Sequence, residues 1–367
     1  MKRFLTLFPD AANVHLAKDV GMIPYVLHQH FGYDSTLASY QNGEYLTLNH
    51  ELIGLKQLFI QKAFRNELLD VLLFLLINSR KFDVLNVYHL VRNSWVSGLF
   101  FKVITLNRGK VFLKLDVDDR LFNYQPKGLK KKIFDFIFSK IDLISVESST
   151  YTTYLNENNK LGQSISLIPN GFYNYGVQQT TAFADKENLI ITVGRVGSHQ
   201  KATEVLCDAF VSFAESNKEW RMEVIGPIEK DFQNYILRFH ENHPALSARV
   251  TFVGEITDRE TLYHYYKRAK IFALTSRWEG FPIVFPEAIH HGCYVIATNL
   301  PAAQDITGNG QYGKLFPVDD VESLTLALEE ACQNQDKLAL NCQQVQIFAS
   351  RKFSWVSICS QINNLLK

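Results

Sequence analysis

Short apolar runs alternate along the chain with longer stretches in which apolar residues recur every three or four positions. The short runs are typical of strands buried on both faces, and the longer period is typical of helices that pack on one side. Their alternation favours parallel sheets joined by right-handed crossovers, and therefore an α/β protein with two Rossmann-like domains. We expect strands at Lys2–Phe8, Val84–His89, Val111–Leu115 and Leu143–Val146 in a first domain, and at Ile165–Ile168, Leu189–Val193, Met222–Ile225, Val250–Val253, Ile271–Thr275 and Tyr294–Ala297 in a second.

Helix signals fill the intervals between these strands. Thr257 and Glu260 stand three positions apart, as in a capping box, which predicts a helix from Asp258 to Lys270. The polar and irregular stretch from Pro169 to Lys186 predicts the boundary between the two domains. Further helices are expected at Val321–Cys332 and Phe353–Leu366.

Composition narrows the class of protein. A chain of 367 residues, with 47% hydrophobic and 20% charged residues, suits two globular domains that each bury a core. The five cysteines are scattered and form no C-x-x-C pair, so we expect reduced core residues in a cytoplasmic protein. The apolar run after Met1 ends at Pro9, and the run Leu68–Ile77 contains Asp70. We therefore expect no signal peptide and no membrane-spanning helix, and we interpret Leu68–Ile77 as a core helix.

The charge distribution is more informative than the net charge. A net charge of +1 does not indicate nucleic acid as a partner. Residues 1–168 carry 20 lysines and arginines against 15 carboxylates, and much of the excess lies in Lys127–Lys140, where aromatic and aliphatic residues alternate with lysines. This segment is either a helix that contacts an anionic membrane surface or a core-packing helix with a solvated basic face. The first interpretation suits a peripheral protein on the inner face of the membrane.

The segment from Ser276 to Gly292, S-R-W-E-G-F-P-I-V-F-P-E-A-I-H-H-G, carries the strongest chemical signal. It follows an apolar strand, which is where open α/β sheets place their ligands. Pro282 or Pro286 marks the entry of a helix, so backbone N–H groups near Gly280 and Phe281 are expected to form an anion cradle. Two carboxylates eight positions apart, Glu279 and Glu287, suit sugar hydroxyls. A solvated pair of glutamates flanking a helix start is the alternative interpretation.

A second cluster follows the strand Leu189–Val193. Gly194 permits a tight turn, Arg195 supplies a planar fork for phosphate oxygens, and Lys201 stands near the start of an amphipathic helix as a mobile point charge. A strand, a glycine turn, two cations and a helix start together predict a phosphate site. Ordinary surface cations are the alternative.

These motifs, together with Ile168-Pro-Asn-Gly171 and Val253-Gly254, resemble the donor-binding half of retaining glycosyltransferases of family 4. The match is specific over about residues 165 to 320 and weak over residues 1 to 160. It implies the GT-B architecture, with two Rossmann-like domains facing across a cleft and a C-terminal helix that returns to the first domain. The implied domains are an acceptor-side domain 1–170, a donor-binding domain 171–345 and a returning helix 346–367.

The resemblance also implies an activity. It predicts transfer of a sugar, with retention, from a nucleotide-diphosphate sugar, expected to be a UDP-sugar, to a glycan, lipid-linked or protein acceptor in cell-surface polysaccharide or glycoconjugate synthesis. No further cofactor and no metal are expected. Arg195 and Lys201 would stabilise the leaving diphosphate, Glu279 would contact the donor sugar and Glu287 the ribose. The complete predicted donor site is Gly194, Arg195, Lys201, Gly254, Glu279, Gly280, Phe281, Pro282 and Glu287.

The first domain departs from the family pattern at two places. Asp116 falls where many members carry a histidine, and we expect it to stabilise positive charge on the reacting carbon or to bind an acceptor hydroxyl. With Asp118 it also forms a D-x-D motif, which could bind Mg²⁺, although the cations of the second domain make this interpretation unnecessary. The segment Pro9-Asp-Ala-Ala-Asn13 stands where family members often carry a glycine pair after the first strand, and its two alanines restrict backbone angles that glycines would allow. Asn13 and His15 are predicted on the acceptor side, although a lone histidine is more often structural.

Two other functions compete with transfer. A catalytically inactive GT-B partner subunit, which binds sugar or stabilises another glycosyltransferase, would explain the altered first domain. A GT-B epimerase or phosphorylase would use the same fold. The Arg, Lys and two Glu residues favour an active transferase, with Arg195, Lys201, Glu279 and Asp116 as its catalytic residues.

Overall fold

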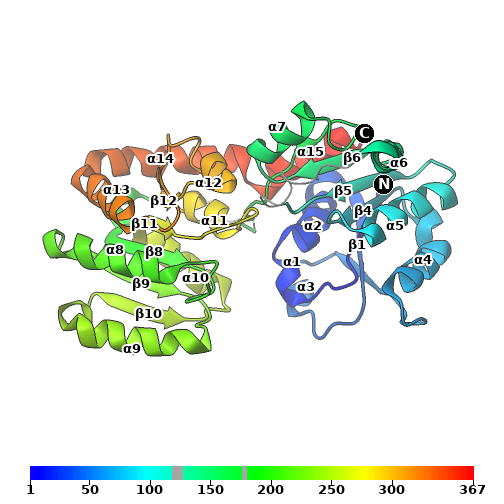
Figure 1. Cartoon of the computed structure of the whole chain (residues 1–367). Helices are drawn as coiled ribbons and strands as arrows, with labels where there is room; N and C mark the ends of the chain where they lie inside the picture. Colours follow the sequence, from blue (N-terminus) through cyan, green and yellow to red (C-terminus); the bar gives the residue numbers. More distant parts are fainter. Residues whose placement is uncertain (118–126, 176–179) are drawn as a thin grey trace. The chain divides into compact units, whose positions relative to one another are not determined.

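The computed structural model describes residues 1–117, 127–175 and 180–367. The chain divides into two compact units: Met1–Tyr173 together with Ser354–Lys367 form unit 1, and Asn174–Phe353 form unit 2. Each unit holds one parallel sheet with helices packed against it (Figure 1). The expected α/β class with two Rossmann-like domains is confirmed.

Unit 1 contains a seven-stranded sheet in the order β3-β2-β1-β4-β5-β6-β7, and its strands pair in parallel. Two apolar clusters, one built around Leu85 and Leu113 and the other around Phe4 and Phe112, pack against the sheet. The strands are β1 (Lys2–Leu7), β2 (Tyr33–Ser39), β3 (Lys56–Phe59), β4 (Val84–Tyr88), β5 (Lys110–Lys114), β6 (Leu143–Val146) and β7 (Ser166–Leu167).

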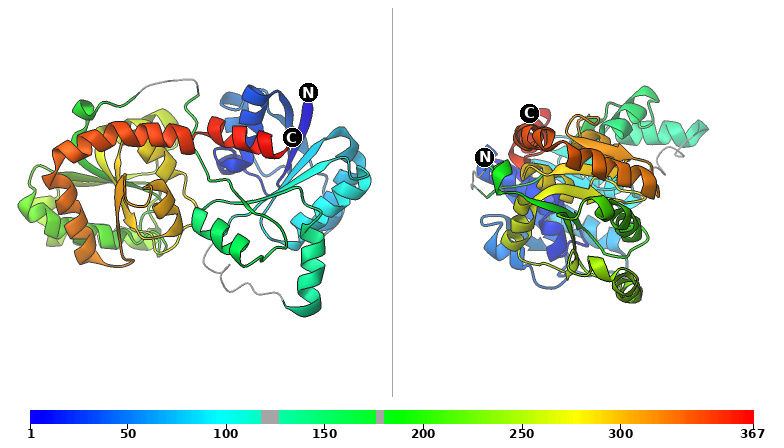
Figure 2. Two further views of the ribbon diagram at one scale, coloured as in Figure 1. Left: turned by 90° about the horizontal axis from the view of Figure 1, so that it is seen from above. Right: turned by 90° about the vertical axis from the view of Figure 1, so that its left-hand side faces the viewer.

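The C-terminal helix belongs to unit 1, as the GT-B expectation requires. Trp355, Ile358 and Ile362 of this helix are buried in the same cluster as helix α2, and Figure 2 shows the red helix beside the blue N-terminal elements. The hydroxyl of Tyr33 donates to Oδ1 of Asn363 at 3.0 Å. The helices of unit 1 are α1 (Asn13–Leu16), α2 (Asp19–Phe31), α3 (Leu46–His50), α4 (Glu67–Asn78), α5 (Arg92–Ile104), α6 (Gly128–Phe138), α7 (Ser149–Glu157) and α15 (Trp355–Leu365).

Unit 2 contains a six-stranded parallel sheet in the order β10-β9-β8-β11-β12-β13. The strands are β8 (Glu187–Val193), β9 (Arg221–Ile225), β10 (Val250–Gly254), β11 (Ala269–Leu274), β12 (Tyr294–Thr298) and β13 (Gly313–Phe316). The helices are α8 (Thr203–Ser216), α9 (Gln233–Asn242), α10 (Arg259–Arg268), α11 (Val284–His290), α12 (Pro301–Ile306), α13 (Val321–Gln333) and α14 (Gln335–Lys352). The core joins the apolar stripe of α8, predicted from Val205 to Phe213, to α13 and the sheet.

Several boundaries differ from those expected. The strand predicted at 165–168 for the second domain is β7, which pairs with β6 and so belongs to unit 1. Helix α10 is capped by Asp258, whose Oδ2 accepts from the Thr261 backbone N–H at 2.8 Å, and not by a box at Thr257. Unit 2 extends to Phe353, beyond residue 345, because α14 runs unbroken to Lys352.

Burial in the structure bears on the expected core helix and on the expected core cysteines. The helix expected over 68–77 is α4, which buries Val71, Phe74 and Leu75 but exposes Leu76 and Ile77. All five cysteines are buried and unpaired. Within the described residues, no helix combines the length and the apolar character needed to cross a bilayer.

Candidate functional site

Strand order places the main predicted residues at one edge of unit 2. The sheet reverses its order between β8 and β11, which are neighbours although they are distant along the chain. Ligands of open α/β sheets bind at the carboxyl ends of strands at such a reversal. Arg195 follows β8, and Glu279 follows β11. The fold therefore brings the two sequence clusters together.

The loop after β8 is shaped by close contacts that only small residues allow. A Cβ on Gly226 would lie 1.8 Å from the carbonyl oxygen of Gly194, so glycine is required where the loops after β8 and β9 cross. The backbone N–H of Gly226 donates in turn to the carbonyl of Gly254 at 2.8 Å. The carboxyl ends of β8, β9 and β10 are thus held together, and they include the predicted residues Gly194 and Gly254.

Lys201 and Glu279 form a nearly buried ion pair. Lys201 Nζ lies 2.5 Å from Glu279 Oε1, and the two side chains are 15% and 7% exposed. The hydroxyl of Ser276 donates to the same carboxylate at 2.6 Å. The hydroxyl of Thr275 donates to the carbonyls of Lys201 and Ala202, each at 2.9 Å, and thereby fixes the start of α8 against the end of β11.

Arg195 is exposed, and its Nη2 donates to Oε1 of Gln200 at 2.8 Å. In the part of the chain that the structure describes, Arg195 pairs with no carboxylate. Since a guanidinium carries five N–H donors, several remain to face an anion. The predicted cations therefore differ: Lys201 is already engaged with Glu279, whereas Arg195 presents its charge to solvent.

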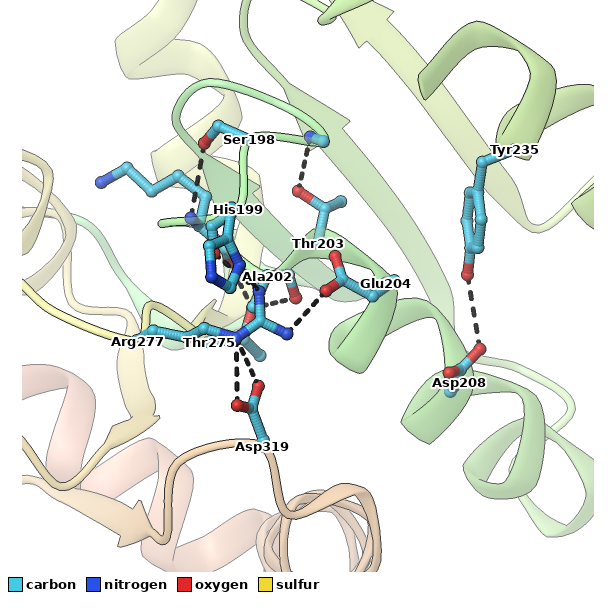
Figure 3. A network of polar contacts seen from close by, with 12 residues as sticks. Ser198, His199, Ala202, Thr203, Glu204, Asp208, Tyr235, Thr275, Arg277 and Asp319 are labelled. Carbon is cyan, nitrogen blue, oxygen red and sulfur yellow. Dashed lines mark hydrogen bonds and ion pairs between the residues drawn. The ribbon is translucent and has the colours of Figure 1, made fainter. Parts of the chain in front are cut away.

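Arg277 ties the two loops together, and the sequence analysis did not identify it. Its guanidinium donates to Glu204 Oε1 at 2.8 Å and to the carbonyl of His199 at 2.7 Å, and its Nε lies 2.8 Å from Asp319 Oδ1. Figure 3 shows these contacts converging on one guanidinium from three segments of the chain. Arg277 thus anchors the turn that carries Lys201 to the loop that carries Glu279.

Glu287 lies in α11 and is only 6% exposed. Its Oε2 accepts from the hydroxyl of Tyr266 at 3.2 Å, and its Oε1 lies 3.9 Å from Nη1 of Arg259. Burial raises the pKa of Glu287 to about 7, although Arg259 and Tyr266 both favour its ionised form. A buried carboxyl group whose pKa lies near 7 is a candidate functional group.

The segment between Glu279 and Glu287 contains residues that shape the loop before α11. Gly280 and Pro282 precede α11, which begins at Val284, so the helix starts after Pro282 and not at Pro286. Phe281 is 4% exposed and packs against Phe353, with ring centroids 5.8 Å apart. Its side chain therefore fixes the loop, and any contact with a ligand falls to its backbone.

The acceptor-side predictions fall at the carboxyl edge of the unit 1 sheet. Asp116 follows β5 and is exposed, whereas Asp118 lies outside the described residues, so the structure describes only half of the D-x-D motif. Beside it, Lys114 is buried in contact with Glu147 and lies 2.9 Å from Asp19. Burial alone lowers the pKa of Lys114, but these two carboxylates raise it above its ordinary value. This buried cluster was not predicted, because a lysine that ends an apolar strand gives little sequence signal.

Asn13 and His15 have local structural partners. The Oδ1 of Asn13 accepts from the backbone N–H of Thr47 at 2.8 Å, which holds α3 against α1. The Nδ1 of His15 accepts from the backbone N–H of Ala12 at 3.0 Å, and burial together with Lys18 lowers the pKa of this histidine. His15 is thus a neutral ring that keeps Nε2–H as its remaining donor. Contact of either residue with an acceptor stays a prediction.

Across residues 1–117, 127–175 and 180–367, no three His, Cys, Asp or Glu side chains gather as a metal site would require. The positive charge that pairs with Glu279 comes from Lys201.

Part of this chain is similar to known glycosyltransferases. The family model described as glycosyl transferases group 1 matches residues 177–345, which covers most of unit 2. The lipopolysaccharide core biosynthesis mannosyltransferase LpsB of Rhizobium meliloti is 23% identical over 56% of this chain and 59% of its own length. The capsular polysaccharide biosynthesis glycosyltransferase CapH of Staphylococcus aureus is 25% identical over 63% of each chain. The chain thus spans less than two thirds of either relative.

A solved structure extends the likeness over both units. The structure of Anabaena Alr3699/HepE in complex with UDP and glucose superposes with a TM-score of 0.72 over 100% of this chain and 99% of that one, at 17% identity. This likeness establishes the GT-B fold. Within this fold, residues 177–345 of the second unit match the glycosyl transferases group 1 family model.

Proposed function

We propose that this chain is a retaining glycosyltransferase that moves a sugar from a UDP-sugar to a glycan, lipid-linked or protein acceptor in cell-surface polysaccharide or glycoconjugate synthesis. The observation that carries the proposal is the convergence of Arg195 and the Lys201–Glu279 pair at the β8–β11 edge of the family's domain. Relatives named for lipopolysaccharide core and capsule synthesis, and a structural neighbour that holds UDP, support it.

Lys201 can serve two partners at once. An ammonium carries three donors, so it can hold Glu279 at 2.5 Å and still donate to a phosphate oxygen. Glu279, fixed by Lys201 and Ser276, is then oriented to accept from hydroxyls of the donor sugar. Arg195 contributes a second positive charge with donors that point to solvent. Negative charge grows on the diphosphate as the glycosidic bond breaks, so both cations stabilise the transition state more than the ground state.

Retention follows from attack on the same face as the departing diphosphate, with a phosphate oxygen taking the proton of the acceptor hydroxyl. Asp116, exposed at the carboxyl edge of the unit 1 sheet, would bind an acceptor hydroxyl or stabilise positive charge at the reacting carbon. Glu287 would hold the ribose. The test is release of UDP from UDP-sugars, screened first by thermal shift. Absence of both binding and turnover would favour the partner-subunit alternative.

Helix α6 suits contact with an anionic membrane. Its inner face packs into unit 1 through Phe134 and Phe138, while Leu129, Ile133 and Phe136 are at least half exposed. Lys131 pairs with Asp135 at 2.7 Å, and Lys127, Lys132 and Lys140 add positive charge along the same segment. Exposed apolar residues flanked by lysines bind anionic bilayers. The core-packing interpretation describes the inner face of this helix, and membrane contact is our proposal for its exposed face.

Vesicle flotation tests the membrane contact. The wild type should float with vesicles containing anionic lipid and should dissociate as salt rises, because the attraction is screened. Replacing Leu129, Ile133 and Phe136 together with serine should abolish flotation, whereas Leu326→Ser, an equally exposed leucine of unit 2, should not. Flotation that survives the triple replacement would remove α6 from the proposal.

A further inference from the structure

Gln200 occupies the centre of the candidate donor site, although nothing in its sequence context marks it. Its side-chain amide meets three groups: Oε1 accepts from Arg195 Nη2 at 2.8 Å, and Nε2 donates to the carbonyl of Trp278 at 2.9 Å and to Glu279 Oε2 at 3.5 Å. The network also fixes which end of the amide is oxygen, since the reverse orientation would place NH₂ against the guanidinium. We propose that Gln200 is the positioning residue that sets Arg195 and Glu279 at their working separation. This inference rests on the proposed function.

The amide does this without altering either charge. A carboxylate at position 200 would form an ion pair with Arg195 and occupy the donors meant for phosphate. A lysine there would neutralise Glu279 a second time. An amide accepts from the cation and donates to the carboxylate, so it orients both while Arg195 keeps its full charge for the diphosphate.

The main chain of Gln200 is itself held in place. The backbone N–H of Arg277 donates to the carbonyl of Gln200 at 2.8 Å, and the Arg277 guanidinium holds the preceding residue through the carbonyl of His199. Glu204 and Asp319 fix that guanidinium in turn (Figure 3). Gln200 therefore acts from a braced turn, and its amide position follows from Arg277.

Two substitutions separate positioning from simple folding. Gln200→Met keeps the length but removes both hydrogen-bonding ends. It should lower kcat about tenfold to a hundredfold, because displacing charged groups by fractions of an ångström misaligns them with the transition state, and should change the affinity for UDP much less. Gln200→Glu keeps the shape but introduces a carboxylate. The adjacent Arg195 guanidinium favours its ionised form, so this side chain repels Glu279 and captures Arg195.

The experiment measures kcat, KM and UDP affinity of the wild type, Gln200→Met, Gln200→Glu and the control Gln311→Glu, an exposed glutamine of the same unit, from pH 5 to 8.5. Groups that face position 200 are Arg195, Lys201, Glu279, His199 and Arg277, so each rate is divided by that of the wild type at the same pH. The kcat ratios of Gln200→Met and Gln200→Glu should be low at every pH and should fall further below the wild type than the UDP affinities do, whereas Gln311→Glu should match the wild type. Position-200 variants with kcat within twofold of the wild type, or an equal fall in kcat and in UDP affinity, would overturn the inference alone. A wild type that neither binds nor turns over any nucleotide sugar would overturn the proposed function and this inference with it.

Discussion

Replacing Glu287 with glutamine should make the protein more stable at alkaline pH and weaken its hold on the nucleotide. The carboxyl group is 6% exposed and burial raises its pKa to about 7, well above the 4.5 of an exposed glutamate. Glutamine keeps the size of the side chain and can still accept from Tyr266 and Arg259, but it cannot ionise. Both effects follow from the loss of one ionisable group. Without it, no charge has to be buried at alkaline pH, and no carboxylate is available to accept from the ribose hydroxyls.

The sign and size of the stability effect follow from proton linkage. Between pH 4.5 and 7 the folded protein holds a proton on Glu287 that the unfolded chain has lost, so stability from this group is greatest below pH 4.5 and falls as pH rises through 7. Since a tenfold change in acid dissociation constant corresponds to about 1.4 kcal/mol, the full loss is about 3 kcal/mol. Most of it, about 2 to 3 kcal/mol, falls between pH 5 and 8.5.

Urea unfolding followed by tryptophan fluorescence at pH 5 and 8.5 measures this difference. Glu287→Gln should gain stability relative to the wild type as pH rises, while the control Glu215→Gln, which removes an exposed carboxylate from α8, should not. UDP should bind the variant about tenfold to a hundredfold more weakly, because a hydrogen bond to a charged group is worth about 1.5 to 3 kcal/mol. A variant whose stability relative to the wild type is the same at both pH values, or which binds UDP normally, would refute the reasoning.

Three further predictions concern the same site. Glu279→Ala should abolish sugar transfer and leave the affinity for UDP nearly intact, as calorimetry and steady-state rates would reveal; equal damage to both would contradict its assignment to the sugar. Binding of UDP-glucose should strengthen as pH rises through about 7 in the wild type, when Glu287 ionises, and stay level in Glu287→Gln; a sugar diphosphate is used because the terminal phosphate of UDP itself titrates near pH 6. Activity should survive EDTA. The D-x-D motif would be revived as a metal site if EDTA abolished the activity, Mg²⁺ restored it, and Asp118→Ala removed the response to Mg²⁺.

The clustering of the candidate donor residues was largely predictable because these residues sit where apolar strands end. Gly194, Arg195 and Glu279 follow β8 and β11, whose buried runs are plain in the sequence, and parallel strands deliver their carboxyl ends to one edge. Strands β2, β3 and β13 were missed. The four residues of β3 are mostly exposed at the edge of the sheet, so they lack the apolar run that marks a buried strand.

The supporting residues could not be found in this way. Gln200 and Arg277 act on segments nearly 80 positions away, and no local pattern records which side chains meet across a sheet. The same holds for Lys114, whose carboxylate partners Asp19 and Glu147 come from other elements. The predicted cap of α10 was wrong because two neighbouring residues can both cap a helix. Thr257 fits a capping box, yet the side chain of Asp258 accepts from the backbone N–H of Thr261.

The central claim is that Arg195 and Lys201 stabilise a leaving diphosphate, and one comparison tests it most directly. UDP release from the donor and the affinity for that donor are measured on the wild type, Arg195→Ala and Lys201→Ala, with thermal unfolding to verify that each variant is folded. The account predicts that each substitution lowers turnover by about 10²- to 10³-fold and donor affinity far less. The reason is that the negative charge on the diphosphate, which the cations stabilise, develops fully only as the glycosidic bond breaks. An equal fall in affinity and in rate would mean that these residues bind the donor without promoting its reaction, and the catalytic assignment would be wrong.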